Sequence, residues 1–493
     1  MDSQQCPFGF SVLRSVAALV ALTTSLLVAG AFGQDNPIPQ VVGPPHPQAV
    51  TPGGGDFTLK VYGANFVPGA VVNWNRQPRA TTYVSGHEVD ATILASDIAS
   101  NTAGYITATN PPPGGGVSSA GWTLVEVHEP TATIAPPAKP AFYGYAFQGE
   151  IPELLVADFN NDGIMDLADF DAIGTIPIYL GAANGTFTYS DLASSLYWPI
   201  FSFNNATYGD FNGDGNVDLA YDSYLNRSSS TGLDVSLGDG NGRFTPGWKE
   251  DQIAVANVLA GDFNCDGNLD LIAGYSSYTY VYLGNGDGTF NLSETLNFGP
   301  TGIRLAGDFN GDGNLDLVLV SDSKPTKISV ALGNGDGTFQ QPRTITSYVG
   351  GCDAGPTMLV NDFNGDGKLD IAFCTWGEIG VLLGNGDGTF RQPIYYDVYP
   401  FGDAGSFSFA AGDFNSDGKT DLIVSNNGLN TQFSVLLGNG DGTFQKQQSI
   451  LLSPKGTNGE LGIQIGDFNS DGLLDFILQE GGYSAGVYLQ EQP

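Results

Sequence analysis

The chain has 493 residues, with 52 acidic against 17 basic side chains and a formal net charge of −35. No basic patch is left that could neutralise phosphates, so the composition argues against a nucleic-acid partner. The length allows more than one domain with a large core, and 69 glycines beside three methionines and three histidines favour strands and turns.

Residues 1–33 have the pattern of an export signal. Arg14 precedes an apolar run from Val16 to Val28, and small residues follow it. We expect cleavage between Ala31 and Gln34, which predicts a secreted, periplasmic or cell-surface protein without an integral membrane segment. The alternative is an uncleaved membrane anchor, although the run is short for a helix that spans a bilayer.

Residues 34–128 predict a small sandwich of two antiparallel sheets, because short alternating apolar segments are separated by turn signals such as Pro68-Gly69. The expected strands are Phe57–Tyr62, Val71–Trp74, Val89–Leu94 and Tyr105–Ala108. Residues 129–140 contain four prolines and predict a stiff, extended linker.

The stretch FTLKVYGANFVPGAVVNWN, from Phe57 to Asn75, resembles the immunoglobulin-like IPT/TIG family. The later NPPPGGGVSS, from Asn110 to Ser119, fits the closing turn of that family. The resemblance implies a binding or spacer module that carries no catalytic residues.

Residues 141–493 are built on a repeat, D-F-N-x-D-G-x-x-D, which occurs seven times. Successive copies start 46 to 54 residues apart, about the length of one four-stranded propeller blade. The copies are Asp158–Asp166, Asp210–Asp218, Asp262–Asp270, Asp308–Asp316, Asp362–Asp370, Asp413–Asp421 and Asp467–Asp475.

A second motif, L-G-N-G-D-G-T-F, follows the expected third strand at Leu332–Phe339 and recurs at Leu283, Leu383 and Leu437, with degraded copies at Leu180 and Leu237. Asn-Gly and Asp-Gly supply the positive φ angles of tight hairpins, so this motif predicts a turn; a second metal site is the alternative. In the fourth copy we expect strands at Gly302–Gly307, Leu317–Val320, Ile328–Leu332 and Arg343–Tyr348. The repeated loop and the turn both follow odd-numbered strands, which predicts that they share one face of the disc.

The seventh copy stops after Val487–Leu489, without a fourth strand. The segment Lys139–Phe147, ahead of the first copy, is similar to fourth strands such as Gln341–Tyr348. We therefore predict that it completes the last blade and joins the two ends of a ring, which removes an exposed sheet edge.

The repeated loop offers oxygen ligands at positions 1, 3, 5 and 9, a glycine for the bend at position 6 and a carbonyl at position 7, an arrangement that a hard cation can use. Calcium is favoured over magnesium by the flexible loop, and over zinc by the lack of imidazole and thiolate ligands. The alternative is a set of Asp/Asn turns without metal, although a turn alone does not require three carboxylates. Phe at position 2 is expected to pack between blades. The predicted ligands are Asp158, Asn160, Asp162, Asp166, Asp210, Asn212, Asp214, Asp218, Asp262, Asn264, Asp266, Asp270, Asp308, Asn310, Asp312, Asp316, Asp362, Asn364, Asp366, Asp370, Asp413, Asn415, Asp417, Asp421, Asp467, Asn469, Asp471 and Asp475.

Residues 141–493 resemble the FG-GAP/VCBS repeat family, which includes the N-terminal propellers of integrin alpha subunits. The resemblance implies a seven-bladed β-propeller with Ca²⁺ in the hairpin between the first two strands of each blade, up to seven ions in all. Several integrin blades lack the metal loop, whereas every copy here keeps it.

Three cysteines remain beyond the export signal, and Cys352 and Cys374 flank one loop closely enough to form a disulfide. The sequence gives little support to catalysis. All three histidines, His46, His87 and His128, precede the repeats, and no nucleophile elbow, zinc motif or phosphate-binding loop is present.

We expect a secreted calcium-binding recognition or adhesion protein with a protein or carbohydrate partner. A secreted polysaccharide-active lyase or hydrolase on the same scaffold is the alternative, and a purely structural extracellular component is a third reading. Connections that differ between copies should lie on the face opposite the repeated loops, and divergent loops suit recognition. They are 221–232, 348–356, 399–406 and 453–461, and the candidate contacts, for which packing within strands is the alternative, are Tyr197, Trp198, Trp376, Tyr399 and Tyr483.

Overall fold

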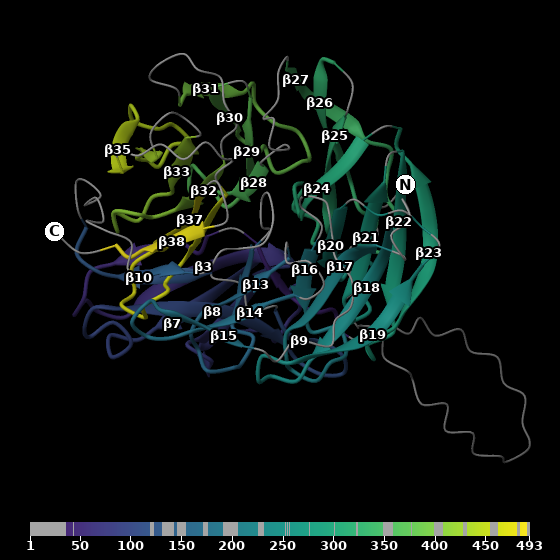
Figure 1. Cartoon of the computed structure of the whole chain (residues 1–493), viewed down its shortest axis with the longest axis horizontal. Coiled ribbons are helices and arrows are strands. Elements are labelled where there is room, and N and C mark those ends of the chain that lie inside the picture. The colour runs from purple at the N-terminus through teal and green to yellow at the C-terminus, as the bar shows by residue number, and fades with distance from the viewer. Residues whose placement is uncertain are drawn as a thin grey trace, which may run out of the picture.

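The computed structural model is all-β in the residues it describes (Figure 1). These are 36–42, 44–118, 123–130, 142–144, 154–170, 176–190, 206–224, 231–251, 253, 255, 257–275, 277–299, 301–321, 324–348, 358–375, 377–398, 408–426, 431–453, 462–480 and 484–490. The expected export signal, most of the proline-rich linker and most of the divergent connections lie outside this set. Within the described ranges there is no helix long and apolar enough to cross a membrane.

Two sheets precede the repeats, and they pack face to face. One has the order β1-β3-β7-β6, and the other has β2-β10-β8-β4-β5 with β9 paired to β8. The strands are β1 Gln40–Val41, β2 Ala49–Val50, β3 Phe57–Ala64, β4 Val71–Trp74, β5 Gln77–Pro78, β6 Ala80–Ser85, β7 Glu88–Ile93, β8 Thr102–Asn110, β9 Gly116–Val117 and β10 Leu124–Val127. All four strands expected from the alternating pattern are present.

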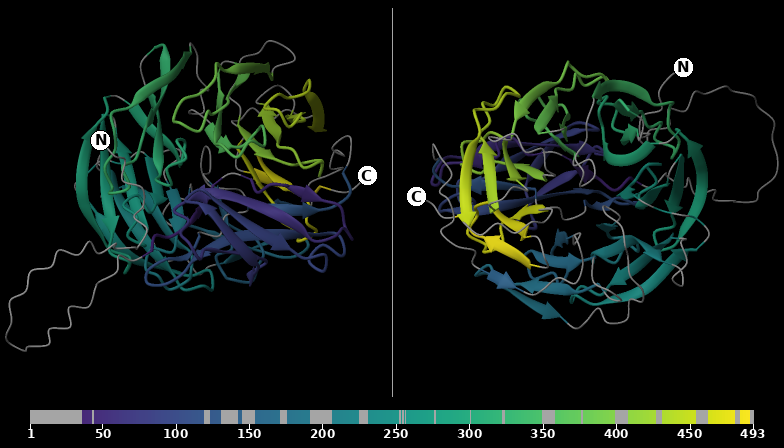
Figure 2. Two further views of the ribbon diagram at one scale, coloured as in Figure 1. Left: turned by 180° about the vertical axis from the view of Figure 1, so that it is seen from behind. Right: turned by 45° about the horizontal axis from the view of Figure 1, so that its top comes forward.

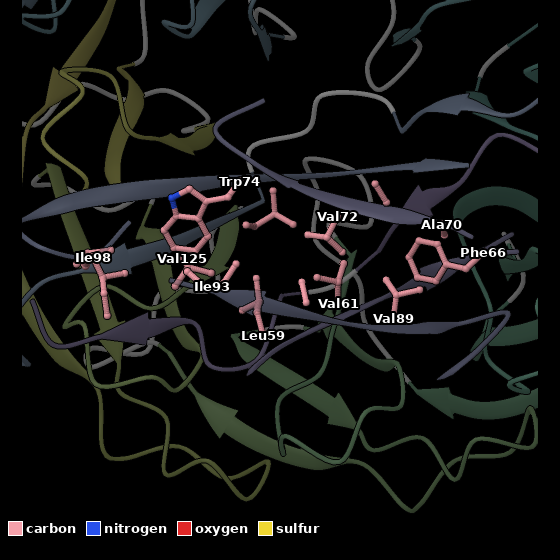
Figure 3. Packing of buried hydrophobic residues seen from close by; sticks show 14 residues of the cluster. Leu59, Val61, Phe66, Ala70, Val72, Trp74, Val89, Ile93, Ile98 and Val125 are labelled. Carbon is pink, nitrogen blue, oxygen red and sulfur yellow. The ribbon is translucent and has the colours of Figure 1, made fainter. Parts of the chain in front are cut away.

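The core between these sheets follows from that alternation, because every second side chain of a strand faces the partner sheet. Leu59, Val61, Val72 and Trp74 are buried between the two layers (Figure 3). Gly104 is required at its position, since a Cβ there would lie 2.3 Å from the Trp74 ring. We refer to these two layers, residues 36–130, as the sandwich.

The described residues from 142 onward form seven four-stranded antiparallel sheets. The first sheet has the strands β12 Leu154–Ala157, β13 Asp166–Asp169, β14 Ile178–Gly181 and β15 Phe187–Ser190. The second has β16 Ala206–Gly209, β17 Asp218–Tyr224, β18 Thr231–Gly238 and β19 Phe244–Glu250, and the third has β20 Asn257–Gly261, β21 Asp270–Tyr275, β22 Tyr278–Gly284 and β23 Phe290–Asn297. The fourth has β24 Thr301–Gly307, β25 Asp316–Ser321, β26 Thr326–Ala331 and β27 Arg343–Tyr348, and the fifth has β28 Met358–Asn361, β29 Asp370–Cys374, β30 Glu378–Leu382 and β31 Ile394–Asp397. The sixth has β32 Phe409–Gly412, β33 Asp421–Asn426, β34 Thr431–Leu436 and β35 Gln448–Ser453, and the seventh has β36 Ile463–Gly466, β37 Asp475–Glu480, β38 Ser484–Tyr488 and β11 Phe142–Gly144.

These sheets follow one another around an axis, and the yellow C-terminal sheet lies beside the blue first one (Figure 2, right). Buried clusters such as Phe309, Val320, Ile371 and Phe373 join residues of neighbouring sheets into one hydrophobic layer. First strands of successive sheets contact each other near the axis, as in β16 with β20 and β20 with β24. This arrangement is β-propeller-like.

The last sheet is completed by a strand from before the first repeat. β11 pairs antiparallel with β38, with Phe142 opposite Val487 and Gly144 opposite Ala485. The sheet order is β11-β38-β37-β36. The predicted joining of the two ends is therefore confirmed, and β38 is covered on both sides.

Candidate metal loops and the face that they share with the sandwich

The fourth repeated loop shows how the sequence folds locally. Asp308 Oδ1 accepts hydrogen bonds from the N–H groups of Gly311 (2.7 Å) and Asp312 (3.1 Å), and its Oδ2 accepts one from Gly313 (2.8 Å). Asn310 Oδ1 accepts the Asp312 N–H at 2.8 Å. Gly313 has a φ of +86°, a conformation that favours glycine. Side chains at positions 1 and 3 thus turn inward around a tight bend.

Position 9 has a different role. The Asp316 side chain is fully buried, and its Oδ2 accepts the Phe309 N–H at 2.9 Å while its Oδ1 accepts the Gly333 N–H at 2.8 Å. It therefore ties the loop to the turn after the third strand. The same pair of bonds occurs in all seven loops, with the second amide from Gly181, Gly238, Gly284, Gly333, Gly384, Gly438 and Gln490.

All 28 predicted ligands lie in the described residues, and the structure brings those of each loop together around its bend. The side chains at positions 1, 3 and 5 line the turn, and position 9 lies beneath it with no exposed surface in any copy. Within the described ranges, however, no three carboxylate, imidazole or thiolate groups already converge as a metal site. Each position-9 carboxylate accepts two backbone N–H groups, as Asp316 does, and its role as a ligand stays a prediction.

The electrostatics of the loops reflect this crowding of acids. Burial raises the pKa of Asp308 to about 7. The hydrogen bond from the Gly313 amide opposes this rise, and repulsion from Asp312 adds to it. Burial and then repulsion from Asp308 raise the pKa of Asp316 well above its usual range. Burial in the fifth loop raises the pKa of Asp370 to about 8. A bound divalent cation would relieve this repulsion.

The donor chemistry therefore fits a hard cation. Each loop supplies carboxylate and amide oxygens from positions 1, 3 and 5, and neither nitrogen nor sulfur takes part. When bound, such an ion would supply positive charge that holds the bend together. The position-9 carboxylate supports the site through the two backbone amides it already accepts.

Phe at position 2 packs against the last residue of the turn motif in the next sheet, as expected. Six such pairs have ring centroids 5.6 to 5.9 Å apart. They are Phe159 with Phe244, Phe211 with Phe290, Phe263 with Phe339, Phe309 with Phe390, Phe363 with Phe444, and, across the closure, Phe468 with Phe187. These contacts join six of the seven loops to the turn of a neighbouring sheet.

Backbone bonds reinforce the aromatic pairs. The N–H of Gly337, in one turn, donates to the carbonyl of Phe263 in the preceding loop at 3.0 Å, and Gly388 donates to Phe309 in the same way. Loop and turn therefore lie on one face, which confirms the prediction from strand order. The turn motif itself is a tight hairpin, since Asn334 N–H donates to the Thr338 carbonyl and Gly335 has a φ of +73°.

The sandwich lies against this same face, which the sequence did not indicate. In the third loop, Asp262 Oδ2 accepts the Ile38 N–H at 3.0 Å, and the Asp262 carbonyl accepts Asn65 Nδ2 at 3.0 Å. In the seventh loop, the Tyr105 hydroxyl donates to Asp467 Oδ2 at 3.0 Å. A Cβ on Gly472 would lie 2.2 Å from the Thr102 carbonyl oxygen, so the two layers are in close contact.

Glu126 is the acid that the sandwich itself buries in this contact, with 1% of its surface exposed. Its Oε2 accepts the Ser416 hydroxyl at 2.5 Å, and its Oε1 accepts the Leu474 N–H at 3.0 Å, so one carboxylate joins the sixth and seventh loops. Burial first, and then repulsion from Asp413, raise its pKa well above the usual range. Glu126 was not among the residues predicted from the sequence, although an acid within the otherwise apolar strand L-V-E-V is unusual enough to have marked this position.

A cavity of about 380 Å³ lies on the axis, lined by the first strands of several sheets. Its polar lining includes Asn257, Arg304, Ser408 and Gln464. The register shifts between Ile303 and Leu305, so Arg304 stands at a bulge. Its Nη1 donates to Asn257 Oδ1 at 2.6 Å. The sequence did not single out either residue.

The five aromatic residues predicted as partner contacts, Tyr197, Trp198, Trp376, Tyr399 and Tyr483, all lie outside the described residues. So does Cys352, whose disulfide with Cys374 therefore stays a prediction.

FG-GAP-like repeats match four stretches of the chain, residues 158–221, 308–358, 362–424 and 413–478. The chain thus carries FG-GAP-like repeats on a β-propeller-like scaffold. No curated protein sequence is significantly similar to it.

Among solved structures, an Agrocybe aegerita lectin that recognises non-reducing terminal N-acetylglucosamine is similar, with 15% identity and a TM-score of 0.45 over 83% of this chain and 99% of the lectin. The complex of BBS1N with ARL6DN gives 10% identity and a TM-score of 0.47 over 73% of this chain and 98% of that one. Rhamnogalacturonan lyase YesW gives 14% identity and a TM-score of 0.36 over 93% and 91%. Similarities this distant carry no argument about activity.

Proposed function

We propose that the chain is an exported, calcium-binding recognition or adhesion protein, in which a seven-bladed propeller presents its divergent face to an extracellular protein or carbohydrate. The observation that carries the proposal is the position of the repeated loops. They are lined with buried acids and lie on the same face as the sandwich. Calcium there has a structural role, and recognition falls to the opposite face, where connections differ between copies.

We also propose an architecture for each of the two parts of the chain. The seven four-stranded sheets are the blades of one closed propeller, and the two N-terminal sheets form an immunoglobulin-like module of the IPT/TIG type. The sheet order of the closing blade supports the first, and the motif from Phe57 to Asn75 supports the second. The module is fixed against the loops rather than held away from the ring.

Calcium is tested by calorimetric unfolding of the chain from residue 34 onward, with Ca²⁺ and with chelator. Binding to the native state alone raises the unfolding midpoint, so chelator is expected to lower it and added Ca²⁺ to restore it. Addition of Mg²⁺ at the same concentration is the control for ionic strength. An unchanged midpoint in chelator would overturn the structural role of the ion.

Recognition is tested by glycan arrays and by binding to extracellular matrix proteins. Binding without change of the ligand is the expected result. A polysaccharide-active enzyme is the second candidate, supported by the polar cavity that Asn257, Arg304 and Gln464 line on the axis. New reducing ends or unsaturated products on incubation with polysaccharides would favour that candidate over the first.

A further inference from the structure

The hairpin between β4 and β5 carries an arginine to the first repeated loop. Its two turn residues, Asn75 and Arg76, have φ angles of +50° and +63°. Left-handed backbone is uncommon for residues other than glycine, and a strained turn of this kind needs support from its surroundings. The Asn75 side chain supplies that support, because its Nδ2 donates to the Ala103 carbonyl at 3.0 Å and its Oδ1 accepts the Tyr105 N–H at 2.8 Å.

Arg76 makes two contacts with the first loop. Its Nη2 lies 2.5 Å from Asp158 Oδ2, and its Nη1 donates to the Asn161 carbonyl at 3.2 Å. The Asp158 side chain is only 7% exposed, and it also accepts the N–H groups of Asp162 and Gly163. The guanidinium therefore binds the position-1 carboxylate, the oxygen donor with which each loop begins.

The other loops differ at this position. The sandwich reaches Asp262 of the third loop with the neutral Ile38 N–H, and Asp467 of the seventh with the neutral Tyr105 hydroxyl. In the described part of the chain, the two lysines that pair with loop acids do so at position 5, on Asp366 and Asp417. Among these residues Arg76 alone brings positive charge to position 1.

We propose that the Arg76 guanidinium takes the place of the divalent cation in the first loop. Two positive groups that compete for the same carboxylate oxygen repel each other, and the planar fork of arginine matches a carboxylate and a neighbouring carbonyl. The chain then holds six cations rather than seven. The first loop fixes the sandwich to the ring without metal. The inference rests on the calcium binding proposed above.

Native mass spectrometry of the chain from residue 34 onward, in Ca²⁺, counts the bound ions. We expect six for the wild type and seven for Arg76→Ala, because removal of the guanidinium frees the first loop. Arg79→Ala is the matched control: Arg79 is in the same sandwich but pairs with Asp97 at 2.7 Å, so six ions should remain.

A second pair of variants tests the same inference from the side of the loops. Asp158→Asn should leave the count at six, whereas Asp308→Asn, at the same position of the fourth loop, should lower it to five. Seven ions in the wild type, or six in Arg76→Ala, would overturn the inference and leave calcium binding intact. No bound ions in any variant would overturn both.

Discussion

Closure of the ring can be tested through one aromatic pair. Phe187, in the turn of the first blade, packs against Phe468, in the loop of the last, with centroids 5.8 Å apart and ring planes at 65°. Phe187 is 5% and Phe468 0% exposed. The two lie at opposite ends of the repeats in sequence, so they can meet only if the ring is closed.

A double-mutant cycle isolates their interaction. Truncation of a buried Phe to Ala costs about 3–5 kcal/mol, and an edge-to-face pair contributes roughly 0.5–1.5 kcal/mol beyond area burial. The variants Phe187→Ala, Phe468→Ala and the double substitution should therefore show a coupling energy of about 1 kcal/mol. The equivalent interior pair, Phe309 with Phe390 at 5.8 Å, should show the same value.

The assay is urea unfolding in Ca²⁺, followed by tryptophan fluorescence, with free energies compared at one urea concentration within the transition. The control is the unrelated pair Phe187 and Phe444, which should be additive within roughly 0.3–0.5 kcal/mol. Additivity for Phe187 and Phe468, beside clear coupling for Phe309 and Phe390, would refute closure through this contact.

Three further outcomes are expected. Asp316→Asn keeps the size of the side chain but replaces one of its two oxygen acceptors for buried amides. It should therefore lower the free energy of unfolding, measured by urea unfolding, by about 1–3 kcal/mol. An unchanged free energy of unfolding would contradict the role of position 9. In chelator, burial raises the pKa of folded Asp308 from 3.8 to about 7. Its contribution to stability is therefore fully present below about pH 4 and is lost as the pH rises through about 7, so the unfolding midpoint should fall over this range. An unfolding midpoint that rises over this range, or that falls equally in Ca²⁺, would refute this account. Removal of everything before Leu154 leaves β38 without β11, and size-exclusion chromatography should then show self-association through the open edge; a purely monomeric product would contradict it.

Much of this architecture could be predicted because each copy of the repeat fixes its own local geometry. The fourth copy illustrates this: the expected Arg343–Tyr348 is β27 itself, and the other three strands differ by one or two residues at their ends. The Asp and Gly positions of the loop set the bend, and similarity between fourth strands was enough to predict that the segment containing β11 joins the last blade.

Contacts between distant parts of the chain could not be predicted in this way. The position of the sandwich depends on single residues such as Glu126 and Arg76, whose partners lie far away in sequence and follow no period. The same holds for Arg304, which a bulge directs towards the axis. The spacing of the loop predicted a ligand at position 9, but it could not predict that this carboxylate also accepts a backbone amide from the turn after the third strand.

The place of Glu126 has a consequence for the sheet that joins the two ends of the repeats. β10 is held beside the sixth and seventh loops, and His128 Nε2 contacts the Asp471 carbonyl at 2.9 Å. The chain reaches β11 only a short distance later, so that strand is kept near the site where β38 must add. A short tether raises the effective concentration of its end. The sandwich, through its contacts with the sixth and seventh loops, thus helps to hold together the sheet that β11 and β38 share.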